Sequence, residues 1–448
     1  MARICQWQET ACLCHTCRHG ILLLSWKLQP FQLSLEVKLG RPYVWDPWLS
    51  AKHQPERTAV VSRNLTCTFA NLVRQAESVA RGLQGAHIAE GSVVATDIPP
   101  GPELFAIALA ALRGGYGFFP VPRGLAAGIR HALIREAETA IYVTGTEDSV
   151  QFDRVISFAN LTDLGARQRG NGADRAVGQR CGYLVFVTSG TTGEPKVVIR
   201  QRPRYPYRGV AVNPLYGAGL DNGPHIMANA TFHLGTLGPA LYAIQAGSAV
   251  IVQQEWSAGY FRELIDQYKS DSAFLSARQL VDTVLDSHRA SHALQILFHG
   301  GSPTSHAVKI GAIRLFGPIV HEFYGTSVGI ISEARSAEWL SHRGSVGRPL
   351  PGVRVGIHAD DRIVPVGTIG NIHVRYRSID SGNSSSLYHD TGDVGFVDNE
   401  GYIFVLGRAA KMGDRHTSAR LEDLVRMIPG IVDVAVIAGS SADGILDC

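Results

Sequence analysis

The sequence predicts an α/β fold in which two mainly parallel sheets pack with helices, followed by a small β subdomain. Three observations predict this class. Strand-like and helix-like segments alternate along residues 69–298, which is typical of parallel sheets joined by helices. Val185–Val187 is apolar on both faces, as in a buried parallel strand. Strand-like segments at 370–375 and 402–406 indicate the β subdomain.

The first predicted helix rests on apolar residues with helical spacing. They are Phe69, Leu72, Val73, Ala76, Val79, Ala80 and Leu83. Residues 92–97 then read as a strand, and Pro102 begins a helix that runs to Leu112, because proline is favoured in a first turn. A strand at Tyr116–Val121 and a helix at Ala127–Ala137 continue the alternation. This order predicts a parallel sheet with helices on its faces.

Later segments extend the pattern. Residues 277–285 form another amphipathic helix, placed just before a strand at Ile296–Phe298. Near the end of the chain, four apolar residues fall on one helical face: Leu421, Leu424, Val425 and Ile428. A strand at Val432–Ala438 follows this helix, so an α+β fragment is expected after the β subdomain.

Composition excludes few classes of protein. The chain has 448 residues, too many for one ordinary compact core, so several subdomains are expected. Its net charge of +3 gives no support for a nucleic-acid or anionic membrane partner. No apolar run approaches the about 20 residues of a membrane span.

Cys67, Cys181 and Cys448 are scattered, which predicts a reducing, cytoplasmic location. Four more cysteines lie within residues 5–17, but the second pair of a zinc ribbon is absent.

The most informative segment runs from Tyr183 to Lys196. A short apolar strand enters a loop of hydroxylated residues and glycines, and a second strand follows at Val197–Ile199. Glycines let the backbone approach a ligand, and free N–H groups and hydroxyls donate to phosphate oxygens. A lysine adds a compact positive charge. The predicted polyphosphate site consists of Thr188, Ser189, Gly190, Thr191, Thr192, Gly193 and Lys196.

This loop differs from the common nucleotide P-loop, which needs the sequence G-x-x-x-x-G-K-[ST] at the start of a helix. Here Lys196 is followed by a β-branched run, and Gly190 and Gly193 are too close together. Residues 188–196 instead resemble the phosphate-binding signature of the adenylate-forming superfamily. That superfamily contains acyl-CoA synthetases, peptide-synthetase adenylation domains and luciferases. The resemblance covers residues 41–430.

Downstream segments resemble further motifs of this superfamily, in the same order. Phe232–Gly235 resembles the segment that lines the acyl pocket, which implies a catalytic role for His233. Leu297–Pro303 resembles the strand and glycine turn beside the adenine, formed here by Gly300 and Gly301. Gly344–Gly352 resembles a turn-rich connector.

The remaining motifs imply direct nucleotide contacts. In the segment Glu322–Ser327, the resemblance places Tyr324 on the adenine. It places Gly325, Thr326 and Ser327 at the α-phosphate. Farther along, Asp393 is implied to accept hydrogen bonds from both ribose hydroxyls, assisted by Arg408.

The resemblance implies an AMP-forming acid–thiol ligase of acyl-CoA-synthetase type. A carboxylic acid, fatty or aryl, attacks the α-phosphorus of ATP, and the acyl group then passes to coenzyme A or an acyl-carrier protein. ATP, Mg²⁺ and coenzyme A are the implied cofactors, and Lys196, Ser327 and His233 the implied catalytic residues. Small residues at Gly235 and Gly238 favour an extended acyl tunnel. No metal-ligating side chain is predicted.

Three departures from the family pattern bear on activity. Val328 occupies the position of a glutamate that helps to hold Mg²⁺ in the family, and valine offers no oxygen ligand. The glycine pair expected after Arg408 is missing. The family's C-terminal lysine would lie beyond Cys448, so we expect impaired adenylation from a truncated C-terminal domain.

The expected division of the chain into domains is an unassigned extension at 1–40, an AMP-binding domain at 41–406, and a C-terminal fragment at 407–448.

Two alternatives remain open from the sequence. One is a catalytically inactive protein, or truncated gene product, that binds a nucleotide or an acyl-adenylate. The other is a stand-alone amino-acid adenylation domain. Peptide-synthetase domains usually carry an aspartate near the Phe232 segment, where this chain has His233.

Overall fold

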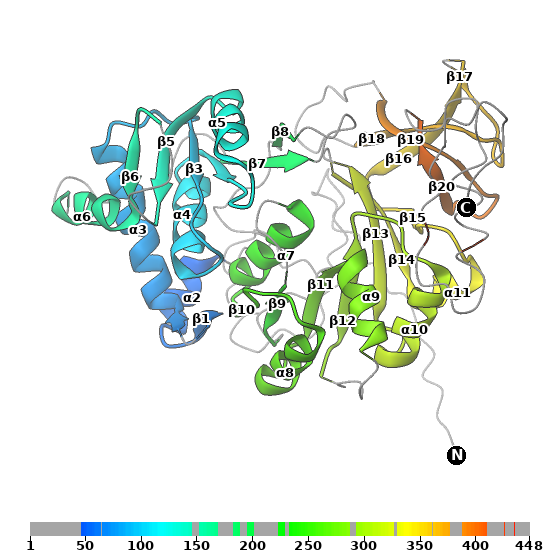
Figure 1. Cartoon of the computed structure of the whole chain (residues 1–448), viewed down its shortest axis with the longest axis horizontal. Coiled ribbons are helices and arrows are strands. Elements are labelled where there is room, and N and C mark those ends of the chain that lie inside the picture. The colour runs from blue at the N-terminus through cyan, green and yellow to red at the C-terminus, as the bar shows by residue number, and fades with distance from the viewer. Residues whose placement is uncertain are drawn as a thin grey trace, which may run out of the picture. The chain divides into compact units, whose positions relative to one another are not determined.

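The computed structural model describes most of the chain from Asp46 to Ala409 (Figure 1). The described ranges are 46–63, 65–145, 152–168, 182–188, 195–200, 223–228, 233–286, 293–326, 329–360, 362–376 and 388–409, with Val425 and Val434. The residues from Val44 onward form one compact unit. The loop at 189–194, Ser327, the cysteines near the N-terminus and most of the predicted C-terminal helix and strand lie outside these ranges.

The largest sheet in the described residues has nine strands. In spatial order they are β15 (Arg348–Pro349), β14 (Gly329–Arg335), β13 (Val320–Thr326), β12 (Ile296–Gly300), β11 (Ser272–Ser276), β9 (His225–Met227), β10 (Val250–Val252), β1 (Thr58–Ser62) and β2 (Leu65–Thr68). The strands from β13 to β1 are parallel, and the outer ones are antiparallel. The carboxyl ends of β12 and β13 therefore lie side by side at one edge.

A second sheet of six strands carries the predicted phosphate loop. Its order is β6 (Val155–Ser157), β5 (Thr139–Thr144), β3 (Val93–Thr96), β4 (Gly117–Pro120), β7 (Tyr183–Thr188) and β8 (Lys196–Arg200). Only β8 runs antiparallel to its neighbour in this described sheet. The predicted strand–loop–strand arrangement is confirmed, with Thr188 and Lys196 opposite each other where the loop leaves and returns.

Helices fill the space between the two sheets and cover their outer faces. The helices α3 (Phe69–Gly85), α4 (Pro102–Arg113) and α7 (Leu234–Gln245) share one core with strands of both sheets. Every residue of Leu104–Leu112 is buried, because α4 meets apolar neighbours all around. The far face of the nine-stranded sheet is covered by α8 (Ala258–Tyr268), α9 (Ala277–Leu285) and α10 (His306–Phe316). The six-stranded sheet is covered by α5 (Ala127–Glu136).

Three short helices complete the described elements: α2 (Pro47–His53), α6 (Phe158–Arg167) and α11 (Ser336–Ser341). The predicted helix at Phe69, the proline start at Pro102 and the helix at 277–285 are confirmed, with ends that differ by a residue or so. Among the described helices, none combines the length and the apolar content that crossing a bilayer requires.

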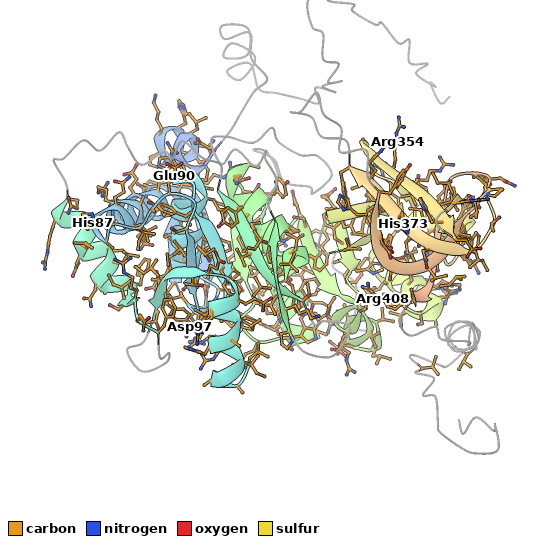
Figure 2. All side chains as sticks on the ribbon, turned by 90° about the horizontal axis from the view of Figure 1, so that it is seen from above. His87, Glu90, Asp97, Arg354, His373 and Arg408 are labelled. Carbon is orange, nitrogen blue, oxygen red and sulfur yellow. The ribbon has the colours of Figure 1, made fainter. Side chains whose placement is uncertain are left out.

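The predicted β subdomain is an antiparallel sheet of five described strands. In order they are β17 (Arg362–Ile363), β16 (Val353–Ala359), β18 (Gly370–Tyr376), β19 (His389–Val397) and β20 (Ile403–Arg408). Figure 2 marks Arg354, His373 and Arg408 on these strands. Backbone hydrogen bonds from Val346 N to Ile403 O and from Ile403 N to Gly347 O attach this sheet to the segment before β15. The sheet is thereby fixed beside β13 and β14.

Helices α3 and α6 cross at glycines. A Cβ atom at Gly165 would lie 1.8 Å from the carbonyl oxygen of Ser78, and one at Gly82 would lie 2.2 Å from that of Leu161. The close approach lets Ser78 Oγ donate to the carbonyl oxygen of Thr162 at 2.8 Å.

We expect Gly165→Ala to lower the free energy of unfolding by about 2 kcal/mol or more, because the backbones must separate to admit a methyl group. Gly128→Ala is the matched control, since a Cβ atom on that exposed position of α5 meets nothing within 4 Å. It should be neutral or slightly stabilising. Chemical denaturation measures both, and equal midpoints for the two variants would contradict the packing argument.

Candidate active site

Three residues predicted to bind a nucleotide meet around the Asp393 carboxylate. The hydroxyl of Tyr324, at the end of β13, donates to Asp393 Oδ2 at 2.7 Å. Arg408 Nε lies 3.1 Å from Asp393 Oδ1, and the two residues are cross-strand partners on β19 and β20. The position of Arg408 can be followed in Figure 2. Residues from distant parts of the chain thus form one charged cluster between two sheets.

The turn before Asp393 is held by hydrogen bonds of its own. Thr391 Oγ1 donates to the carbonyl oxygen of Ile372 at 2.7 Å and accepts from Asp393 N at 3.1 Å. Arg408 Nη1 donates to the carbonyl oxygen of Thr391 at 3.2 Å. Gly392 has φ +74°, a left-handed conformation that favours glycine. The Thr-Gly-Asp sequence therefore fixes the direction of the carboxylate.

Burial sets the electrostatics of this cluster. Asp393 is 5% exposed, and its burial raises the pKa of the carboxyl group, although Tyr324 and Arg408 oppose this shift. Burial and the nearby Asp393 charge raise the pKa of Tyr324, so its hydroxyl remains a donor. The contact between Tyr324 and Asp393 was not predicted from the sequence, which assigned the two residues to different parts of the nucleotide.

The glycine turn lies at the adjoining strand end. A Cβ atom at Gly300 would be 2.5 Å from the carbonyl oxygen of Phe323, so glycine allows β12 and β13 to approach there. Gly301 has φ +89°, and a Cβ atom at this position would meet nothing within 4 Å. A Cβ atom at Gly325 would be 2.6 Å from the carbonyl oxygen of Gly329. An open backbone surface at Gly301 therefore lies beside the strand that carries Tyr324, as a bound nucleotide would require.

The structure places the other predicted phosphate residues only in part. Lys196 is exposed at the start of β8, opposite Thr188. Ser189, Gly190, Thr191, Thr192, Gly193 and Ser327 lie outside the described residues. Thr326 is the last residue of β13 and lies opposite Gly329. The described residues thus bring together the segments predicted to bind adenine and ribose, and the triphosphate loop also stays a prediction.

His233 lies where α7 begins. Its carbonyl oxygen accepts from Thr236 N and Leu237 N, and the residue is exposed. A Cβ atom at Gly235 would lie 2.7 Å from the ring of Phe274. This glycine therefore lets α7 pack closely on the Phe274 ring of β11, and the acyl tunnel expected beside Gly235 stays a prediction.

An aromatic cluster that the sequence reading missed lies next to α7. It consists of Phe274, Phe298 and Phe323, all buried, and the last two rings stack with centroids 4.9 Å apart. These residues lie on three neighbouring parallel strands. Their order in the sheet, which the sequence does not state, is what brings them together.

Glu333 does not replace the glutamate expected at position 328. Its Oε1 is 2.6 Å from His321 Nδ1 and 3.7 Å from Arg335 Nε. Glu333 is the cross-strand partner of Phe323, so it faces the side of the sheet opposite Tyr324. Within the described ranges, no three His, Cys, Asp or Glu side chains gather closely enough to hold a metal ion.

Comparison with known proteins identifies the family. A family model described as "AMP-binding enzyme" matches residues 48–382, which is most of the chain. The chain belongs to the AMP-binding enzyme family. The matched region includes the predicted phosphate loop, the glycine turn and Tyr324.

Curated relatives of this AMP-binding enzyme are ligases. Indoleacetate–CoA ligase from Aromatoleum aromaticum is 26% identical over 422 residues, covering 86% of this chain and 82% of the relative. The 2-succinylbenzoate–CoA ligase of Bacillus subtilis is 22% identical over 413 residues, with 87% and 84% covered. The fatty acid–[acyl-carrier-protein] ligase ScoC of Streptomyces coeruleorubidus is 24% identical over 433 residues, with 86% and 82% covered.

Solved structures confirm the fold. O-succinylbenzoate coenzyme A synthetase (MenE) from Bacillus subtilis, in complex with ATP and magnesium ion, has a TM-score of 0.70 at 19% identity, covering 86% of this chain and 85% of that one. ATP-bound MatB from Rhodopseudomonas palustris also has a TM-score of 0.70, at 20% identity, with 89% and 86% covered. The predicted α/β class with mainly parallel sheets is therefore correct.

The raised pKa of Asp393 predicts the behaviour of Asp393→Asn. Because folding raises this pKa, the ionised carboxylate costs stability at pH 7, and the cost disappears as the pH falls through its titration range. We expect the variant to equal or exceed the wild-type free energy of unfolding at pH 7, by up to about 1 kcal/mol. Urea denaturation at pH 7 and pH 4 tests this. A variant that is much less stable at pH 7 would show instead that the ion pair with Arg408 outweighs burial.

Proposed function

We propose that this AMP-binding enzyme activates a carboxylic acid with ATP and transfers the acyl group to a thiol. A carboxylate oxygen bonds to the α-phosphorus of ATP, and the bond to the bridging oxygen breaks, which releases pyrophosphate. The thiol sulfur of coenzyme A or a carrier protein then displaces AMP from the acyl-adenylate. Relatives named as CoA ligases and as an acyl-carrier-protein ligase support this reaction class.

The cluster of Tyr324, Asp393 and Arg408 is the observation on which the proposal depends. A buried carboxylate is a strong acceptor for a pair of ribose hydroxyls, and Arg408 balances its charge from a half-exposed position. The open backbone of Gly301 lies at the end of β12, beside the strand that carries Tyr324, and we assign the base to this surface. These residues provide a sugar acceptor and an adjoining surface for a base.

Phosphate binding is assigned to the remaining predicted residues. We assign the β- and γ-phosphates to the loop that ends at Lys196, and the α-phosphate to Thr326 and Ser327. Donors aimed at charge that develops during the reaction lower the barrier most. Mg²⁺ accompanies ATP in this proposal and keeps most of its water ligands, since Val328 supplies none.

The acid is proposed to lie near the start of α7. His233 is exposed there, and the Phe274 cluster borders the same helix. Three buried aromatic rings favour an apolar acid, aryl or fatty, over a charged amino acid.

Acid-dependent exchange of labelled pyrophosphate into ATP tests the proposal. We expect exchange with at least one aryl or fatty acid, and about 100-fold less for Lys196→Ala, because the loop then lacks its positive charge. Lys52→Ala, which removes an exposed lysine from α2, is the control and should match wild type. Exchange with amino acids alone would identify an amino-acid adenylation domain.

The position of Val328 favours a second function, binding without catalysis. A protein of this kind would gain thermal stability from a non-hydrolysable acyl-adenylate, because ligand binding stabilises the native state. It would show no exchange with any acid. Failure of both assays would overturn both functions.

The domain division and cellular location also remain proposals. We propose residues 41–406 as the AMP-binding domain and 407–448 as part of a second domain, although β20 continues to Arg408. Residues 1–40 stay unassigned. Scattered cysteines, with Cys67 a buried free thiol, support a cytoplasmic location. Cell fractionation that finds the chain in an oxidising compartment would contradict it.

A further inference from the structure

A buried ion pair lies beneath the candidate nucleotide site. Lys309, in the first turns of α10, is 1% exposed, and its ammonium group contacts the carboxylate of Glu322 on β13, which is 9% exposed. Lys309 Nζ also lies 4.7 Å from the centre of the Trp339 ring on α11. The lysine is thus enclosed between a strand and a second helix.

Removing the charges of Lys309 and Glu322 from water costs free energy. Burial lowers the pKa of Lys309, and Glu322 opposes that shift. Burial also disfavours the ionised form of Glu322, but Lys309 holds its pKa below the ordinary range. Such a pair contributes little net stability, because desolvation offsets the attraction between the charges. Stability alone therefore gives no reason for these residue types at these positions.

Their position in the sheet offers a reason. Glu322 lies two residues before Tyr324 and faces the same side of β13. Its cross-strand partner is His299, which directly precedes Gly300 and Gly301. The ion pair therefore lies just before the ends of β12 and β13 that form the candidate site.

The turn that carries Gly301 connects β12 to α10, the helix that carries Lys309. This turn leaves β12 after Gly300 and enters α10, where Ser305 Oγ accepts from Val308 N at the helix start. Thr304 Oγ1 lies 3.5 Å from His299 Nδ1, across the turn. Burial lowers the pKa of His299 to about 4, so its ring is neutral and leaves the charge balance between Lys309 and Glu322 intact.

We propose that Lys309 and Glu322 are positioning residues for nucleotide binding, acting through the ends of β12 and β13. This inference rests on the proposed function of the site. A buried ion pair has a directional energy minimum, which apolar contacts lack, so it fixes α10 and the Gly301 turn relative to Tyr324. Neither side chain needs to touch the nucleotide.

Single and double substitutions distinguish a role of the ion pair in positioning from a role in stability. Lys309→Met and Glu322→Leu, made singly, should each lower the melting temperature markedly, because each leaves a buried charge unpaired. The double variant K309M/E322L should recover most of the wild-type melting temperature. Its dissociation constant for ATP, measured by calorimetry, should remain about tenfold above wild type, with a matching rise in the KM for ATP and little change in the KM for the acid.

A double variant with wild-type melting temperature and wild-type ATP affinity would overturn the inference and leave the proposed function standing. Should the double variant fail to fold, K309Q/E322Q keeps a hydrogen-bonding pair of similar length without charges, and the same comparison applies. Arg278→Met removes an exposed ion pair with Asp282 on α9 and serves as the control, with unchanged ATP affinity. A wild-type protein that binds no ATP would overturn the proposed function and this inference together.

Discussion

The contact between Tyr324 and Asp393 is the constraint on which the rest of the site depends. It joins residues 69 positions apart and connects the parallel sheet to the antiparallel subdomain. The β13 strand brings the phenol, and the Thr391 turn directs the carboxylate, so each sheet supplies one half of the hydrogen bond. The contact therefore adds a side-chain link between the two sheets to the backbone hydrogen bonds that Val346 and Ile403 already make.

The candidate site contains buried charged groups, and burying charge costs free energy of folding. Asp393 is buried although burial disfavours its charge, whereas Lys309 offsets the effect of burial on the charge of Glu322. A folded chain tolerates such groups when other packing supplies the stability. Here the apolar layers around α4 and the far-face helices supply it, so the edge of the sheet can hold buried charged groups.

Local patterns were enough to predict most elements, because the apolar spacing at Phe69–Leu83 and the proline at 102 encode helix geometry directly. Motif order was enough to bring Tyr324, Asp393 and Arg408 into one candidate site. The contact between Lys309 and Glu322 could not be predicted, nor could the close packing of α7 on β11 at Gly235. Both depend on the order of the strands in the sheet. Glu322 reaches Lys309 only because β13 lies over α10, and Gly235 meets Phe274 only because α7 packs on β11.

The environment of Glu333 shows why sequence proximity is a poor guide to ligands. It stands five positions after Val328, close enough to suggest a substitute oxygen ligand. In the sheet, alternation turns it toward His321 and away from Tyr324. Its carboxylate is therefore engaged on the face of the sheet that Tyr324 does not share. Under the proposed function, Asp393 and Tyr324 would still hold the nucleotide, because the contacts between these two residues involve no metal. Under that function, nucleotide binding and metal-assisted chemistry would depend on different residues of this chain.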